Sequence, residues 1–114
     1  MALGMHIKEA KGRVLVIDDE PEVRKIVRHA LERSGYDVVE AEDGEKAIEA
    51  IRSGDNPLLT DVIICDVRMP KINGVEAVSF FREQFPSVPI IVLTGYPDMQ
   101  LATSFLKQGV MEYL

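Results

Sequence analysis

The sequence contains little of what several common kinds of site require. Cys65 is the only cysteine among 114 residues, so neither an internal disulfide nor a cysteine-rich zinc site can form within this chain. Its apolar neighbours favour a buried, unreactive thiol. No apolar run approaches the ~20 residues that cross a bilayer, and residues 1–13 lack the apolar block of a secretory signal. We therefore expect a cytoplasmic protein with no membrane contact.

Positive charge is also scarce, with 13 basic against 19 acidic residues and a net charge of −6. Surfaces that bind nucleic acid need clustered Lys and Arg to neutralise phosphates, so we expect no direct binding of nucleic acid by this domain. The acidic balance is compatible with a cation site instead. His6 and His29 have no metal-ligand partner at close spacing, and we expect both on the surface.

The chain alternates short apolar runs with segments of helical period. Strands are predicted at 14–17, 36–41, 62–65 and 90–93, with a fifth over 110–114. Apolar residues at helical spacing predict four helices, which lie between Pro21 and Ser34, between Asp43 and Ser53, over 75–85, and between Pro97 and Gly109. Asn56 and Pro57 indicate a loop. On the first helix, the solvent side is predicted to carry Arg24, Lys25, Arg28 and Glu32.

This alternation predicts one α/β domain. Strictly alternating strands and helices imply parallel strands joined by right-handed crossovers, with helices on both faces of an open sheet. The pattern alone leaves the strand order open. Residues 1–12 have no clear period, and we expect a flexible N-terminal arm there, followed by the domain over 13–114.

Acidic residues follow two of the predicted strands. Asp18 and Asp19 come after the first strand and Asp66 after the third, while Thr94 follows the fourth. Ligands of open α/β sheets bind beyond the carboxyl ends of the strands, so these side chains converge if the three strands are neighbours. Three ionised carboxylates at close range repel each other unless a proton or a cation is bound. An all-oxygen donor set favours a hard cation, Mg²⁺ first and Ca²⁺ or Mn²⁺ next.

Such a cluster also supports chemistry on phosphorus. Mg²⁺ commonly uses only one or two carboxylates, which leaves one aspartate with an oxygen that can attack phosphorus and form an acyl phosphate. A structural alternative is a capping box, because Glu22 stands three residues after Asp19 at a helix opened by Pro21. Likewise, Asp66 can simply begin a turn. Acidic and hydroxyl residues at three strand ends together favour the site.

Five short segments occur along the chain in a specific order: VLVIDDEP at 14–21, ICDVRMP at 64–70, NG at 73–74, VLTG at 92–95 and GVMEYL at 109–114. Together they resemble the receiver domains of two-component response regulators. The resemblance covers about 13–114, and the order of the segments is its most specific feature. It implies a flavodoxin-like, open five-stranded parallel sheet in the order 2-1-3-4-5.

The resemblance also implies roles for individual residues. Asp66 corresponds to the phosphorylated aspartate. Mg²⁺ would be bound directly by Asp19 and Asp66, through water by Asp18, and by the backbone carbonyl of Arg68. Thr94 corresponds to the hydroxyl residue that contacts the phosphoryl group, and Tyr113 to the aromatic switch residue.

Members of this family carry a Lys shortly after the aromatic switch residue and then a last helix. The sequence stops at Leu114, before both. We expect the parent chain to continue with the Lys, that helix and an output domain. A sheet face that lacks its last helix would favour self-association, so a homodimer is also expected.

Three functions remain open at this point. The first is a phosphorelay receiver that accepts a phosphoryl group from the phosphohistidine of a histidine kinase or phosphotransfer protein. It would not be an enzyme beyond limited self-phosphorylation and autodephosphorylation. The second is an interaction module of the same fold that works without phosphorylation. The third, an aspartyl-phosphate phosphohydrolase, is disfavoured because such enzymes often place a second carboxylate where Arg68 stands.

Overall fold

The computed structural model describes residues 10–66, 74–93 and 112–113. Their helices and strands follow one another as β1 (Arg13–Ile17), α1 (Pro21–Arg33), β2 (Asp37–Ala41), α2 (Gly44–Arg52), α3 (Asn56–Leu59), β3 (Thr60–Asp66), α4 (Gly74–Gln84), β4 (Ile90–Leu93) and β5 (Glu112–Tyr113). The first four predicted strands and the first three predicted helices are confirmed, with small shifts in their bounds. The helix predicted between Pro97 and Gly109 lies outside the described residues.

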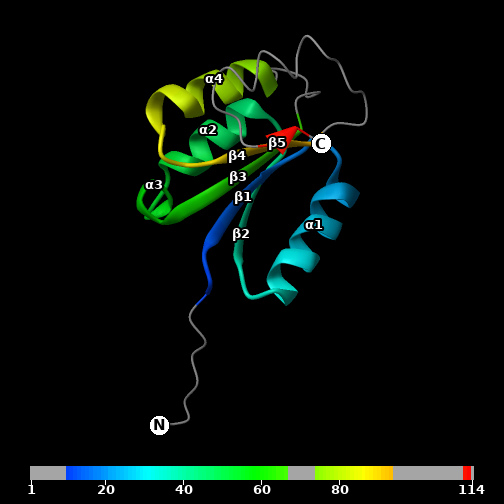
Figure 1. Cartoon of the computed structure of the whole chain (residues 1–114). Coiled ribbons are helices and arrows are strands. Elements are labelled where there is room, and N and C mark those ends of the chain that lie inside the picture. The colour runs from blue at the N-terminus through cyan, green and yellow to red at the C-terminus, as the bar shows by residue number, and fades with distance from the viewer. Residues whose placement is uncertain (1–9, 67–73, 94–111, 114) are drawn as a thin grey trace, which may run out of the picture.

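The strands form one parallel sheet in the order β2-β1-β3-β4-β5. This is the order that the family resemblance implies. Figure 1 shows α2 and α4 on one face of the sheet and α1 on the other, which confirms helices on both faces. Because all strands run in the same direction, their carboxyl ends meet at one edge of the sheet.

Local sequence signals explain where the helices begin and end. Asp43 caps α2, because its Oδ1 accepts the backbone N–H of Lys46 at 2.7 Å. Gly35 and Gly54, which follow α1 and α2, have φ values of +96° and +54°, a backbone region that glycine occupies without steric cost. The predicted loop at Asn56 is wrong, since a one-turn helix, α3, forms there with Pro57 in its first turn.

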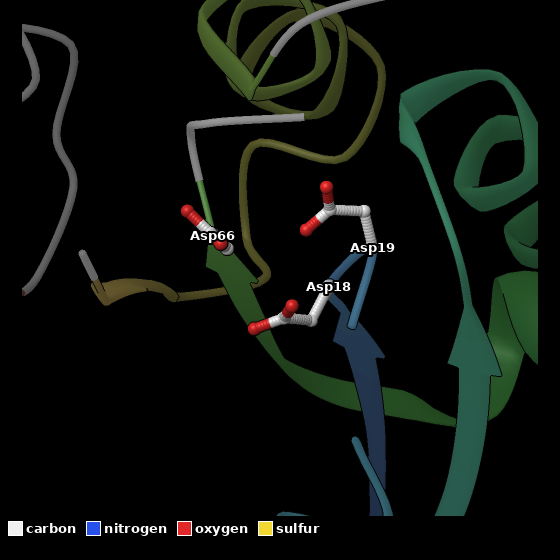
Figure 2. A group of neighbouring side chains, drawn as sticks. All are labelled: Asp18, Asp19 and Asp66. Carbon is white, nitrogen blue, oxygen red and sulfur yellow. The ribbon is translucent and has the colours of Figure 1, made fainter. Parts of the chain in front are cut away.

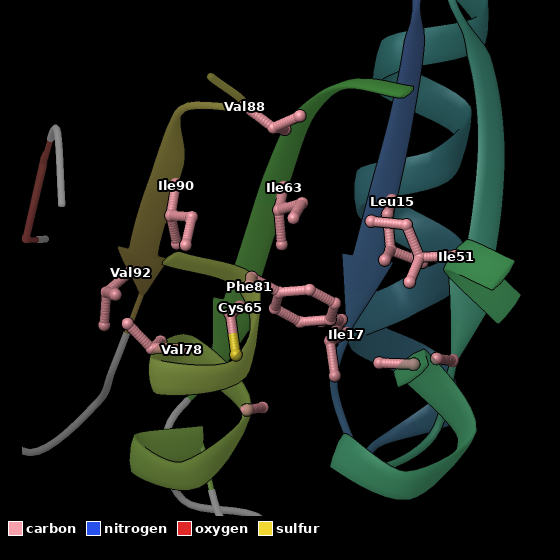
Figure 3. Packing of buried hydrophobic residues seen from close by; sticks show 13 residues of the cluster. Leu15, Ile17, Ile51, Ile63, Cys65, Val78, Phe81, Val88, Ile90 and Val92 are labelled. Atoms are coloured by element: carbon pink, nitrogen blue, oxygen red, sulfur yellow. The ribbon is translucent and has the colours of Figure 1, made fainter. Parts of the chain in front are cut away.

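Among the described residues, one apolar core lies between the sheet and the pair α2 and α4 (Figure 3). Alternate residues of β1, β2, β3 and β4 face it, as the period of two in a strand requires. The largest fully buried side chains of this core are Phe81, Leu15, Ile17, Ile51, Ile63, Ile90, Val78, Val92 and Cys65. Burial raises the pKa of the Cys65 thiol far above its ordinary value, so the expectation of a buried, unreactive cysteine is confirmed.

The face covered by α1 is less deeply buried. No residue of α1 is fully buried, and Ile26 is 69% exposed. The predicted exposure of His29 is confirmed, whereas His6 lies outside the described residues. No helix among the described residues has both the length and the apolar character that a bilayer span needs.

Part of the predicted N-terminal arm lies within the described residues. There, the backbone N–H of Lys11 donates to the carbonyl of Gly35 at 2.8 Å, so residues 10–12 run beside the turn that follows α1. The rest of the arm, residues 1–9, is not described, and its flexibility stays a prediction.

The core makes a direct prediction about stability. Phe81 is 0% exposed at the centre of the cluster, and its truncation in Phe81→Ala leaves a cavity that the neighbours fill only in part. We expect the free energy of unfolding to fall by about 3–5 kcal/mol. Leu58→Ala is the control, because Leu58 is 87% exposed and its truncation should change little. Urea unfolding followed by circular dichroism measures both, and equal losses would contradict the assigned core.

Candidate functional site

The carboxyl ends of β1 and β3 bring three aspartates together. Ile17, the last residue of β1, pairs with Cys65, so Asp18 and Asp66 are the next residues along two adjacent parallel strands. One carboxylate oxygen from each of Asp18, Asp19 and Asp66 lies within 4.8 Å of the others. Figure 2 shows the three side chains around the same space at the edge of the sheet. The convergence predicted from the sequence is therefore confirmed for the three aspartates, while the predicted approach of Thr94 lies outside the described residues.

The three carboxylates differ in their surroundings. Asp18 and Asp66 are half-buried, whereas Asp19 is exposed. Burial is the largest cause that raises the pKa of Asp18 above its ordinary value, and the charges of Asp66 and Asp19 raise it further. A hydrogen bond from the backbone N–H of Glu20, at 2.9 Å, acts in the opposite direction. The cluster without a cation therefore carries an electrostatic cost at neutral pH.

The capping-box alternative for Asp18 and Asp19 is wrong. Glu20 is the N-cap residue of α1, and its side chain makes no capping hydrogen bond. Asp18 instead accepts the N–H of Glu20 within the loop that precedes the helix, a local turn that aspartate commonly forms. The pair therefore belongs to the β1–α1 loop at the edge of the sheet.

Arg24 lies near this site, and the sequence pattern predicted its exposure wrongly. We predicted it on the solvent side of α1, but its side chain is only 16% exposed. It donates from Nη1 to the backbone carbonyl of Asp18 at 2.6 Å and from Nε to Glu40 at 3.2 Å. The helical period could not reveal this, because Glu40 belongs to a neighbouring strand and its distance from Arg24 depends on the tertiary fold.

Three predicted site residues are described in part or not at all. Arg68 and Thr94 lie outside the described residues. Leu93, which directly precedes Thr94 in the sequence, pairs with Asp66 across β3 and β4. Tyr113 is the last residue of β5 and its backbone pairs with Val92. The roles predicted for these three residues stay predictions.

The donor set fits a hard divalent cation. All the ligand atoms that the cluster offers are carboxylate oxygens, the type that Mg²⁺ and Ca²⁺ prefer. A cation would also remove the mutual repulsion of the carboxylates. The same edge of the sheet is where open α/β folds bind their ligands.

Comparison with known proteins points to one family. The family described as the response regulator receiver domain matches residues 14–114. The transcriptional regulatory protein DegU of Brevibacillus brevis is 37% identical over 110 residues, which are 95% of this chain and 45% of DegU. The DNA-binding transcriptional regulator NtrC of Proteus hauseri is 32% identical over 104 residues, 91% of this chain and 21% of NtrC.

A solved structure supports the same assignment. The response regulator TrrA of Thermotoga maritima, in complex with Mg²⁺-BeF, is 33% identical, with a TM-score of 0.77 over 90% of this chain and 84% of that chain. This chain spans only 45% of DegU and 21% of NtrC, so both relatives extend beyond the region that it matches.

The raised pKa of Asp18 predicts a gain in stability when its charge is removed. A carboxyl with a higher pKa in the folded than in the unfolded chain favours folding at acidic pH. This contribution to the free energy of unfolding is lost as the pH rises from the pKa of the carboxyl in the unfolded chain through its pKa in the folded chain. At pH 7 without Mg²⁺, Asp18→Asn should therefore raise the midpoint of thermal unfolding by a few degrees.

Asp61→Asn is the matched control for this measurement. Asp61 also accepts a backbone N–H, that of Arg13 at 3.0 Å, but it does not belong to the cluster. Thermal unfolding of both variants between pH 4 and pH 7.5 tests the prediction. A loss of stability in Asp18→Asn at neutral pH would show that the burial of the charged carboxyl and its repulsion by Asp66 and Asp19 are not the dominant effects.

Proposed function

This chain belongs to the response-regulator receiver domain family, and on that premise we propose that it is a phosphorylation switch whose phosphoacceptor is Asp66. The observation that carries the proposal is the cluster in which carboxylate oxygens of Asp18, Asp19 and Asp66 lie within 4.8 Å of one another. Asp66 ends a central strand, so a rigid sheet holds its carboxylate at the edge where a ligand can approach.

The proposed cofactor is Mg²⁺. Asp19 and Asp66 would bind it directly and Asp18 through water, with the backbone carbonyl of Arg68 as a further ligand. When bound, the ion would neutralise charge on the transferring phosphoryl group. The carboxylate donor set supports this assignment, as does the complex of TrrA with Mg²⁺-BeF.

In the proposed reaction, a carboxylate oxygen of Asp66 attacks the phosphorus of a phosphohistidine on a partner protein. The new O–P bond forms as the N–P bond breaks, and the imidazole of the partner leaves. The donor would be a histidine kinase or a phosphotransfer protein, so the receiver itself needs no catalytic histidine. The product is an acyl phosphate on Asp66.

The phosphoryl group would then shift a two-state equilibrium of the domain. Thr94 would contact the phosphoryl oxygens, and Tyr113 would change its orientation in response. The register of Leu93 with Asp66 supports the role of Thr94, because Thr94 is the next residue in the chain.

We propose that the domain works in the cytoplasm and controls an output domain in the parent chain. Homodimer formation is a further proposal, favoured by the partly exposed α1 face.

The phosphoacceptor assignment predicts a covalent modification at one residue. With Mg²⁺ and acetyl phosphate, the protein should gain the mass of one phosphoryl group, and borohydride reduction should convert the modified Asp66 to homoserine. Asp66→Asn should remove the modification, and Asp61→Asn, outside the cluster, should keep it. Tandem mass spectrometry on the product of the full reading frame identifies the site. Modification of another residue, or none, would refute the assignment.

The metal assignment predicts that Mg²⁺ stabilises the fold. At a Mg²⁺ concentration about tenfold above its Kd, the wild type should gain about 1.4 kcal/mol in free energy of unfolding. Asp19→Ala should lose this gain, because Asp19 supplies one of the clustered oxygens. Urea unfolding with and without Mg²⁺ measures the effect. An equal gain in both proteins would place the ion elsewhere.

A partner-binding measurement separates the switch from the alternative module. If Asp66→Asn binds its partner as the phosphorylated wild type does, phosphorylation is not the signal. The interaction module that works without phosphorylation would then be the better description of this chain.

A further inference from the structure

The backbone of Asp18 is fixed by β2 and α1. Its N–H donates to the carbonyl of Ala41, the last residue of β2, at 3.1 Å. Its carbonyl accepts from Nη1 of Arg24 at 2.6 Å. Its side-chain Oδ1 accepts the N–H of Glu20 at 2.9 Å. Three atoms of Asp18 are therefore held at the point where the chain leaves β1 for residues 18–20, the acidic loop that connects β1 to α1.

Arg24 itself is held in place by a carboxylate of β2. Its Nε donates to Oε1 of Glu40 at 3.2 Å, and the side chains of Arg24 and Glu40 are 16% and 27% exposed. The short hydrogen bond to Asp18 and the bond to Glu40 use different nitrogens of one planar guanidinium group. Such a planar group can fix two acceptors at a set spacing.

Arg28 contacts the same carboxylate without contacting Asp18. Its Nη1 donates to Oε2 of Glu40 at 2.6 Å, and its Nε pairs with Glu32 at 3.2 Å. The hydrogen bond from Arg28 is the largest cause that lowers the pKa of Glu40, so this carboxylate is ionised at neutral pH. Glu40 thus joins two arginines of α1, and only one of them reaches the acidic loop.

We propose that Arg24 is a positioning residue, which holds the backbone carbonyl of Asp18 so that the acidic loop presents its carboxylates for a divalent cation. This inference rests on the proposed metal-dependent function. Arg24 would act through the loop backbone and would not contact the ion. Partners that orient ligating residues commonly change metal affinity by tenfold or more when they are removed.

Charge alone predicts the opposite effect. Arg24 is a cation near a cation site, so removing its charge would strengthen Mg²⁺ binding if electrostatic repulsion dominated. Loss of positioning would weaken binding, because the loop would then have to be ordered when the ion binds. The sign of the change in Kd therefore separates the two roles.

The experiment compares Arg24→Met with Arg28→Met. Both variants remove one guanidinium group from Glu40 and change the net charge equally, but only Arg24→Met removes the bond to Asp18. The Kd for Mg²⁺ is measured by ¹H–¹⁵N NMR titration of the protein that the full reading frame encodes. NMR is chosen over fluorescence because this chain has no tryptophan. Circular dichroism identifies a temperature at which all the proteins are folded.

We expect Mg²⁺ to bind Arg24→Met about tenfold more weakly than wild type, and Arg28→Met to remain within about twofold of wild type. The amide of Asp18 should also exchange with solvent faster in Arg24→Met, as its loop loses a constraint. If Arg24→Met does not fold, Arg24→Gln replaces it, because that shorter side chain cannot span both acceptors.

The outcomes separate this inference from the function on which it rests. If the wild type binds Mg²⁺ and Arg24→Met binds it equally or more tightly, the positioning role is overturned and the metal site remains. Equal weakening in both arginine variants would assign the effect to Glu40 and would also overturn it. A wild type that shows no response to Mg²⁺ would overturn the positioning role together with the metal site.

Discussion

The parallel pairing of β1 with β3 is the constraint on which the rest of the site depends. Once Ile17 is paired with Cys65, Asp18 and Asp66 must follow side by side, since both strands run toward the same edge. Burial, together with the nearby charges of Asp66 and Asp19, then raises the pKa of the Asp18 carboxyl. The fold thus creates a position at which a cation is favoured, and the carboxylate of Asp66, which we propose as the phosphoacceptor, lies beside it.

The rest of the structure holds the three carboxylates close together despite their mutual repulsion. The apolar core beneath α2 and α4 keeps β1, β3 and β4 in register, with Phe81 fully buried against them. On the other face, α1 buries little and instead anchors the acidic loop through Arg24 and the carboxylate of Glu40. The two faces therefore have different tasks, since one stabilises the sheet and the other orients the loop at its edge.

Much of the fold could be predicted because its signals are local. Apolar runs mark β1, β3 and β4, Asp43 caps α2, and Gly35 ends α1 through its positive φ. The acidic cluster was also predictable, since strand ends are visible in the pattern and parallel strands bring them together. The short helix α3 was not predicted, because Pro57 is compatible with a loop as well as with a first helical turn.

By itself, the sequence determined the alternation of strands and helices, the acidic residues at the strand ends and, through its motifs, the family. Only the tertiary structure decided the distances among the three carboxylates and the burial that raises the pKa of Asp18. It alone also decided that Arg24 faces Glu40 and the loop rather than solvent. The reason is physical, since periodicity reports which side of an element is apolar, whereas contacts between residues of different elements depend on how those elements pack.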